Sequence, residues 1–151
     1  MAPKLATARA VGLPELLAFI RPRHQMVLTT FRSDGSLQSS PVTGGVDEQG
    51  RVVISSYPQR AKCRNIRHHP AASVVVLSDE FNGPYVQVDG DAAVIDLPDA
   101  VEPLVEYYRV IAGEHPDWDE YRRAMVAQGK CLIRITLRRW GPVSTGGFPP
   151  R

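Results

Sequence analysis

The fold is decided by one stretch, Val52-Val-Ile-Ser-Ser-Tyr-Pro-Gln-Arg-Ala-Lys-Cys-Arg-Asn-Ile-Arg-His-His-Pro70. Its first residues are apolar and β-branched, a composition typical of a buried strand. Two serines, Ser55 and Ser56, end that strand, and a short basic segment follows until Pro70 stops it. A strand that ends in hydroxyls and leads into a basic helix is a candidate anion site. Free backbone N–H groups and the positive end of the helix dipole would point at the ligand.

The composition is that of an ordinary globular domain. The chain has 151 residues, of which 43% are hydrophobic and 23% charged, enough for one domain with its own core. The formal net charge of +2 is too small to indicate general binding to nucleic acid. No apolar run approaches the roughly 20 residues that a membrane-spanning helix needs. We therefore expect a single domain over residues 1–151 that binds neither nucleic acid nor a membrane.

The cysteines and histidines show no metal-site or disulfide pattern. Cys63 and Cys131 do not form a Cys-x-x-Cys pair. With no recognisable signal peptide, two cysteines fit a reducing, cytoplasmic setting better than a disulfide scaffold. The histidines lack metal-ligand spacing, and there is no Gly-x-Ser-x-Gly nucleophile motif. We expect no metal site, and no catalytic residue can be assigned.

Hairpin turns join most of the predicted strands. Asp34-Gly35 and the segment from Asp47 to Gly50 are strong turn signals between apolar runs. Pro41 removes a ladder donor, so its strand is at an edge or bulged there. The predicted strands are residues 25–31, 37–46, 51–55, 71–77, 84–95 and 130–139.

Short helices are predicted around these strands. Residues 14–20 and 59–69 fit single short helices. Two more follow, one that Asp96 can cap at its N-terminus and one that opens at His115 and ends at Gly129. No Gly-x-Gly-x-x-Gly sequence is present, which disfavours a doubly wound dinucleotide-binding fold. We expect a mainly β (α+β) protein, a six-stranded antiparallel β-barrel, closed or split, with short peripheral helices. Residues 1–12 are expected to form a mobile arm and residues 141–151 an irregular tail.

The basic segment is the stronger candidate for a binding site. On a helix, Arg60, Arg64 and Arg67 share one face, while Lys62 and Asn65 lie on another. A solvated helix face is the simpler interpretation. The anion interpretation is favoured because the segment directly follows the two serines and has no acidic neighbours. Backbone N–H, serine, arginine and lysine together make a coherent phosphate site.

A second candidate is Gln38-Ser39-Ser40-Pro41-Val42, where polar side chains alternate within an otherwise apolar strand. The simpler interpretation is a bulge at a sheet edge. The functional interpretation is a backbone shaped to meet a flat heterocycle, with free carbonyl and N–H groups that read its edge.

The order and spacing of these motifs resemble the pyridoxamine-phosphate-oxidase-like split-barrel proteins, from Leu13 to Pro142. The opening of that family resembles His24-Gln-Met-Val-Leu-Thr-Thr30 with Asp34-Gly35 and Ser39-Ser-Pro-Val42. Its cofactor-phosphate segment resembles Arg60-Ala-Lys-Cys-Arg-Asn-Ile-Arg67 followed by Pro70. Its branch that uses the deazaflavin F420 is similar to Gly113-Glu-His-Pro-Asp-Trp-Asp-Glu-Tyr-Arg122 with Gly129 and Ile133-Arg-Ile135.

The resemblance implies a homodimer with cofactor sites at the subunit interface. It implies that the cofactor phosphate is held by Ser55, Ser56, Arg60, Lys62 and Asn65, and that residues 38–42 line the ring. The resemblance also implies that Tyr85, Gln87 and Trp140 contribute from the partner subunit. The implied reaction is hydride transfer from reduced F420 to a small electron-poor acceptor. FMN as the cofactor, and a non-catalytic F420 carrier, remain as alternatives.

Overall fold

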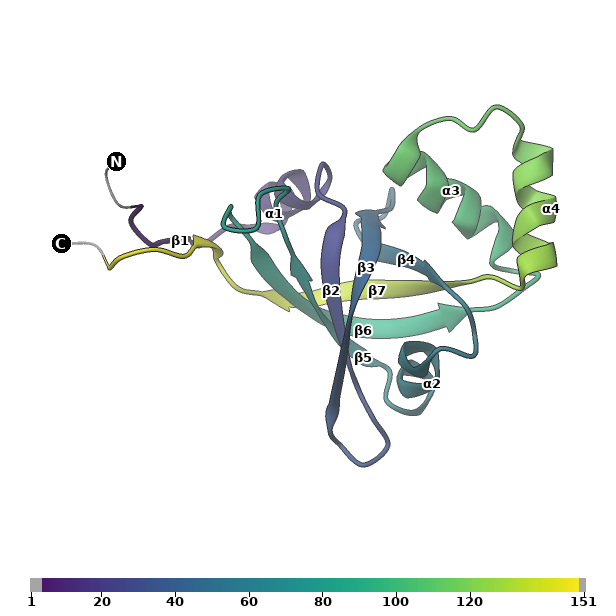
Figure 1. Ribbon diagram of the computed structural model, residues 1–151, viewed down its shortest axis with the longest axis horizontal. Coiled ribbons are helices and arrows are strands. Elements are labelled where there is room, and N and C mark those ends of the chain that lie inside the picture. The colour runs from purple at the N-terminus through teal and green to yellow at the C-terminus, as the bar shows by residue number, and fades with distance from the viewer. Residues whose placement is uncertain (1–3, 150–151) are drawn as a thin grey trace.

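The computed structural model describes residues 4–149, which contain eight strands and four helices. Figure 1 shows one barrel with helices outside it and with both chain ends on the same side. In chain order the elements are β1 (Thr7–Arg9), α1 (Leu13–Ile20), β2 (Gln25–Phe31), β3 (Leu37–Val46), β4 (Val52–Ser56), α2 (Ala61–His68), β5 (Ala71–Val76), β6 (Val86–Ile95), α3 (Val101–Ala112), α4 (Trp118–Gln128), β7 (Cys131–Trp140) and β8 (Val143–Thr145).

The central strands form a closed antiparallel barrel in the order β2-β3-β4-β7-β6-β5, and β5 returns to pair with β2. Alternate residues of a strand face opposite sides of the sheet. The inward set includes Leu28, Val74, Val88 and Ile135, all fully buried. This architecture confirms the predicted six-stranded, mainly β barrel with short peripheral helices.

Strand β3 pairs with a different strand at each end. Residues 37–43 pair with β2, whereas β4 joins β3 only from Gly44 to Val46. Beyond that point β4 continues along β7 through Ser55 and Ser56, so β3 and β4 separate. Pro41 lies in the singly paired part, as predicted for a residue that cannot donate to a ladder.

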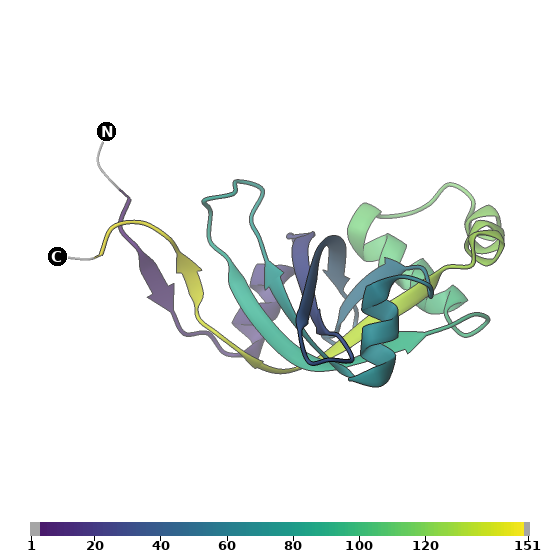
Figure 2. The ribbon, with the colours of Figure 1, turned by 60° about the horizontal axis from the view of Figure 1, so that its bottom comes forward.

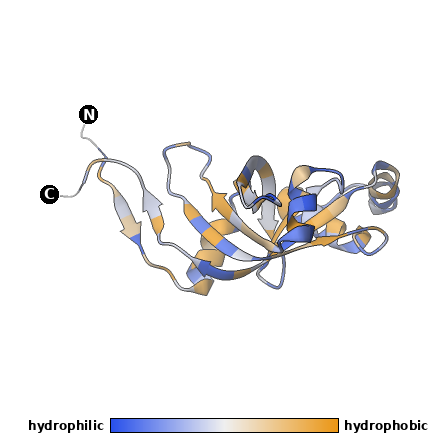
Figure 3. Ribbon diagram, turned by 90° about the horizontal axis from the view of Figure 1, so that it is seen from below, coloured by the Kyte–Doolittle hydropathy of each residue, from blue (hydrophilic) through white to orange (hydrophobic). Residues whose placement is uncertain are grey.

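Helix α2 packs against β2 and β6 at the end of the barrel where β3 and β4 separate. Its buried residues are Cys63, Asn65 and Ile66, and its basic residues face outward. Figure 3 shows this short helix mostly in the hydrophilic colour, outside the apolar strands.

Helices α3 and α4 form a second layer at one end of the barrel (Figure 1). Leu104 and Val105 of α3 and Met125 of α4 pack with Val53 and Leu132 from β4 and β7. Gly129 ends α4 in the left-handed conformation, with φ of 66°, as its position in the sequence predicted. The predicted cap at Asp96 is wrong, because α3 begins at Val101 with Ala100 as its N-cap.

The terminal segments differ from the prediction. Thr7 to Arg9, in the predicted arm, form β1, and Val143 to Thr145, in the predicted irregular tail, form β8. The two strands pair antiparallel in a small sheet of their own, which Figure 2 shows beside the barrel. Each is too short to show a period, and the pairing joins residues 138 positions apart, Thr7 and Thr145. Residues 1–3 and 150–151 of the predicted arm and tail lie outside the described residues.

Within residues 4–149, none of the helices combines the length and the apolar character required to cross a bilayer.

Gly90 tests the packing of the barrel. It lies at a bulge where the pairing of β6 with β7 shifts register, and a Cβ there would overlap the backbone carbonyl of Thr136. We expect Gly90→Ala to lower the free energy of unfolding by about 2 kcal/mol or more, because backbone on the partner strand must move. Gly141→Ala is the control, since a Cβ there meets nothing within 4 Å. Equal urea-unfolding midpoints for the two variants would contradict this packing.

Candidate functional site

The first turn of α2 presents free backbone N–H groups without a side-chain cap. Arg60 is the N-cap residue, its side chain makes no capping bond, and the first turn contains no acidic residue. Arg60 is exposed and Lys62 is half-buried. The local field is therefore positive, which is the arrangement that an anion at a helix N-terminus requires.

The separation of β3 and β4 brings the two candidate segments to one opening. Gly44 lies opposite Ile54 in the antiparallel register. Continuing that register places Val42 level with Ser56, but the strands no longer pair there. The β3 segment proposed to meet a ring and the β4 end proposed to meet a phosphate thus border the same opening.

Strand β3 turns only some of the predicted residues outward. Ser39 and Pro41 are exposed, whereas Gln38, Ser40 and Val42 alternate toward the interior. The Ser39 hydroxyl lies 2.7 Å from that of Thr29. The Ser40 hydroxyl oxygen is buried and has no hydrogen-bond partner among residues 4–149. Ser39 and Pro41 are therefore the two side chains of this segment available to a ligand on the outer surface.

The two serines of β4 also differ in their exposure to solvent. Ser55 is half-buried, whereas Ser56 is 4% exposed and turns into the core. Ser56 lies opposite Cys131 of β7, and its hydroxyl is one of the groups that lower the pKa of the Cys63 thiol. Of the two predicted hydroxyls, that of Ser55 is the one near the surface.

Asn65 has a structural partner inside the protein. Its amide nitrogen donates to the Thr30 hydroxyl at 3.1 Å, and that hydroxyl donates to the Gln38 side-chain oxygen at 3.3 Å. Thr30 is fully buried and Asn65 is 9% exposed. This hydrogen-bond chain connects α2 to β2 and β3. Asn65 and Gln38, which were predicted to bind the ligand, are thus bonded to each other through Thr30 and fix the position of α2.

A basic hollow that the sequence did not predict lies between α2 and the β2–β3 turn. Its volume is about 280 Å³, and Ala61, the first residue of α2, is one of its lining residues. Its basic lining residues are Arg64 and His68 of α2 and Arg32 of the turn. Arg32 lies between β2 and β3 in the sequence, and no local pattern shows that this hairpin folds toward α2.

The outer face of the barrel carries two adjoining hollows. One, of about 500 Å³, includes Gln87 among its lining residues, and the other, of about 620 Å³, includes Tyr85. Both share Val75 of β5. The Gln87 amide donates to the Ser73 hydroxyl at 2.8 Å. Tyr85 and Gln87 lie on this face, whereas α2 packs on β2 and β6 at the barrel end.

The Trp140 side chain makes its contacts within this chain. It is the last residue of β7, and its indole nitrogen donates to the Val11 carbonyl oxygen at 2.8 Å. Its ring packs against the barrel core. The indole thereby attaches the segment before α1 to the barrel, and its one N–H donor is used.

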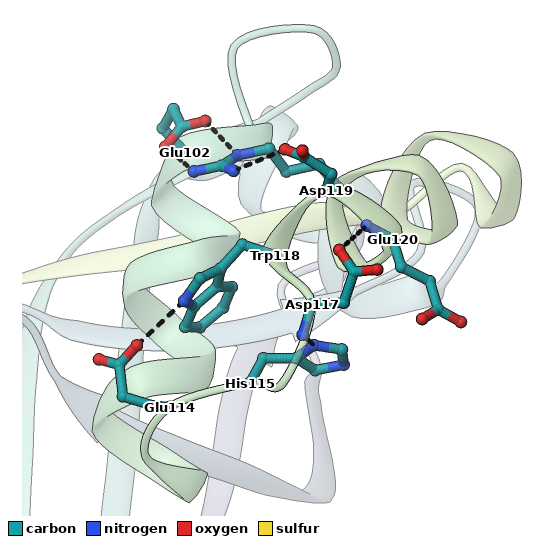
Figure 4. Close-up of polar contacts among 8 residues, drawn as sticks. Glu102, Glu114, His115, Asp117, Trp118, Asp119 and Glu120 are labelled. Atoms are coloured by element: carbon teal, nitrogen blue, oxygen red, sulfur yellow. Dashed lines mark hydrogen bonds and ion pairs between the residues drawn. The ribbon is translucent and has the colours of Figure 1, made fainter.

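The helical segment that resembled the deazaflavin branch, Gly113 to Arg122, is engaged in contacts within the α3–α4 layer (Figure 4). Asp117 caps α4 by accepting from the Glu120 backbone N–H at 3.1 Å. Trp118 donates to Glu114 at 3.0 Å, and Arg122 pairs with Glu102 at 2.8 Å.

Aromatic packing completes this layer. Tyr108, His115, Trp118 and Tyr121 form a cluster with ring centroids 5.1 to 5.7 Å apart. The Tyr121 hydroxyl donates to the Leu104 carbonyl oxygen at 2.9 Å, and burial raises the pKa of Tyr121 to about 12. The segment's contacts in this structure are structural, so they do not identify a cofactor.

The layer borders the candidate site at one point. The Lys130 ammonium lies 4.1 Å from the centroid of the Tyr57 ring, in the loop between β4 and α2. Lys130 thus adds a cation next to the start of α2. No sequence pattern indicates this contact, because Tyr57 and Lys130 are distant in the chain.

Among residues 4–149, no group of three or more His, Cys, Asp or Glu side chains is arranged to hold a metal ion.

Comparison with known proteins agrees with this architecture. Residues 13–144 match the sequence family described as pyridoxamine 5'-phosphate oxidase. The chain belongs to this family. The matched region runs from α1 to β8 and so includes the whole barrel and α2. The resemblance inferred from the motifs is thereby confirmed at the level of the family.

Solved structures share the fold at low sequence identity. A conserved hypothetical protein from Mycobacterium tuberculosis is 19% identical, with a TM-score of 0.74 over 93% of this chain and 89% of that one. A protein described as an F420 reductase is 18% identical, with a TM-score of 0.60 over 82% and 93%. HutZ, described as a heme storage protein from Vibrio cholerae, is 16% identical, with a TM-score of 0.64 over 88% and 95%. Proteins described in these different ways share the fold, so the fold alone does not identify a cofactor.

Thr30→Val tests the hydrogen-bond chain behind the site. The variant keeps the shape of the side chain but leaves the buried Asn65 amide without its partner. We expect the free energy of unfolding to fall by about 1–3 kcal/mol. Replacing Asn65 by Leu as well should recover part of this loss, because both polar partners are then absent.

The matched control is Thr29→Val, which removes a hydroxyl bonded to the exposed Ser39 and should cost less. Equal losses for the Thr29 and Thr30 variants in denaturant unfolding would show that the buried chain has no special role.

Proposed function

We propose that this protein is an oxidoreductase that uses the deazaflavin F420 and holds the cofactor phosphate at the start of α2. The observation that carries the proposal is the uncapped, positively charged first turn of α2 at the opening between β3 and β4. A fold shared with an F420 reductase supports it. Reduced deazaflavin would supply a hydride to an electron-poor organic acceptor.

The residues at this end of the barrel fit a phosphate group. The free N–H groups of the first turn supply neutral donors, and Arg60 and Lys62 supply charged ones. Ser55 would add a hydroxyl from the end of β4. Asn65 and Gln38 would position α2 through Thr30 without contacting the ligand.

The ring would lie along the free edge of β3. Residues 37–43 have a partner strand on one side only, so their backbone groups on the other side are available to a heterocycle. Ser39 and Pro41 face outward there. The protein's part in the reaction is to bind, to orient the ring and to exclude water, and no side-chain nucleophile is required.

The proposal includes a homodimer with the two sites at its interface. The outer face of β2, β5 and β6 supports this, because it carries apolar side chains on an uncovered sheet surface. Val27 and Val75 are half-buried there, and Leu37 and Tyr85, beside it, are 58% and 40% exposed. A second copy that covers this face would bring its Tyr85 and Gln87 toward the ring.

Two alternatives use the same phosphate site. If FMN binds more tightly than F420, the deazaflavin assignment is wrong and the protein is a flavin enzyme. If F420 binds but no acceptor in a panel of quinones and enones oxidises its reduced form, the protein is a carrier.

Lys62→Ala tests the phosphate site. We expect it to weaken F420 binding by about 1–3 kcal/mol, roughly 5- to 150-fold, the range for a charge-assisted hydrogen bond. Arg67→Ala is the control, because it removes the same charge from the last turn of α2, where Arg67 pairs with Asp96 at 2.6 Å. Fluorescence titration of both variants measures the difference. Unchanged affinity in Lys62→Ala, or an equal loss in Arg67→Ala, would remove Lys62 from the site.

Val75→Lys tests the dimer. A charge on the shared wall of the two outer hollows should convert the dimer to a monomer in sedimentation equilibrium, because burying an unpaired lysine is costly. Val126→Lys is the control, on an α4 valine that is 55% exposed. A monomeric wild-type protein, or a Val75→Lys variant that stays dimeric, would contradict the proposed interface.

A further inference from the structure

The two cysteines, 68 positions apart in the sequence, lie against each other in the core. The sulfur of Cys63, in α2, is 3.6 Å from the sulfur of Cys131, the first residue of β7, and both are free thiols. Both side chains are fully buried. Neither thiol has a part in the proposed hydride transfer, and no sequence pattern predicts that they are neighbours.

We propose that Cys63 and Cys131 form an oxidisable dithiol, which a peroxide converts to a disulfide that fastens the first turns of α2 to the start of β7. A disulfide brings the sulfurs to about 2.05 Å. The two sulfur atoms therefore need to approach by roughly 1.5 Å.

The surroundings assign the first step to Cys63. A hydrogen bond from Cys131 lowers its pKa to about 6 against the cost of burial, with smaller help from Ser56, Arg67 and Lys62. The pKa of Cys131 is raised, first by that same hydrogen bond and then by burial. Cys63 is therefore the better thiolate, and the thiolate is the nucleophile in thiol oxidation.

The chemistry balances with a hydroperoxide as the oxidant. The Cys63 thiolate attacks the O–O bond, which breaks to leave a sulfenic acid, and the departing hydroxide takes up a proton to form water. The Cys131 sulfur then attacks the Cys63 sulfur. The S–S bond forms as the S–O bond breaks, and the second oxygen leaves as water. Two thiols lose two electrons in total, and one hydrogen peroxide becomes two waters.

Access requires local opening of α2. The helix has eight residues and no side-chain cap at its N-terminus, so it is a candidate for opening before the barrel unfolds. A small peroxide should then react, while a bulky thiol reagent should react more slowly. In the disulfide form α2 can no longer open freely.

The disulfide should also alter anion binding, a consequence that rests on the proposed function. Cys63 follows Lys62 directly and lies three positions after Arg60. Moving Cys63 toward β7 displaces the N–H groups of the same turn, and hydrogen bonds weaken steeply when their geometry is lost. We expect the oxidised protein to bind F420 about tenfold more weakly than the reduced protein.

The test treats the folded wild-type protein with hydrogen peroxide, quenches it with iodoacetamide and measures the intact mass and the peptides. We expect a mass loss of two hydrogens, one peptide cross-linked between residues 63 and 131, and full reversal by dithiothreitol. Oxygen adducts, cross-links between chains, or two alkylated thiols after treatment would overturn the dithiol. Cys131→Ala is the matched variant. It keeps Cys63 and should give an oxygen adduct at Cys63 and no internal cross-link.

Hydrogen exchange tests whether the disulfide restrains α2, and titration with F420 tests whether it weakens anion binding. Slower exchange of the amides of residues 61–68 in the oxidised protein supports the fastening of α2, and unchanged exchange overturns it. If the reduced protein does not bind F420, the proposed function fails while the dithiol stands. If it binds F420 equally well in both redox states, the link from the disulfide to the anion site is overturned.

Discussion

Helix α2 closes the barrel where β3 and β4 separate, and a buried hydrogen bond from Asn65 to Thr30 holds it there. The Asn65 amide lies in the core, so leaving it unpaired would cost about 1–3 kcal/mol. Because Thr30 in turn donates to Gln38, the same chain of bonds reaches β3. The position of the helix and the shape of the free β3 edge therefore depend on each other.

This arrangement gives α2 two functions that different residues serve. Cys63, Asn65 and Ile66 face the core and fix the helix. The start of the helix remains uncapped, with Arg60 and Lys62 beside the free N–H groups. Protein cores tolerate little change in volume, so the buried side fixes the position of the exposed first turn, where we propose that the anion binds. The same packing places Cys63 against Cys131.

Much of the barrel could be predicted because its signals are local. Asp34-Gly35 and the turn that ends at Gly50 mark hairpins, and β-branched runs mark the strands between them. The pairing of β1 with β8 could not be predicted, because three-residue strands show no period and their partners are distant in the chain. The N-cap of α3 was misplaced for a related reason, since Asp96 is a strong capping residue in sequence but pairs with Arg67 in the structure.

The candidate site could be predicted as a region, but less well as a set of side chains. Strand alternation showed that Ser39 and Ser40 face opposite sides but not which one faces the core. Asn65 and Trp140 were predicted to bind the cofactor. In the structure they donate hydrogen bonds to Thr30 and Val11, and no sequence pattern connects the elements that these bonds join. Lys130 and Arg32 were missed for the same reason. Their contribution comes from tertiary folding alone.

This fold is shared by an F420 reductase and a heme storage protein, so the fold does not by itself say where a ligand binds. The central claim of the account is therefore that the cofactor phosphate binds at the start of α2. A crystal structure of the protein with F420 bound tests it most directly. The account predicts that the cofactor phosphate accepts hydrogen bonds from the first turn of α2 and from Lys62, with the ring along residues 38–42. A phosphate bound on the outer face near Tyr85, away from α2, would contradict it.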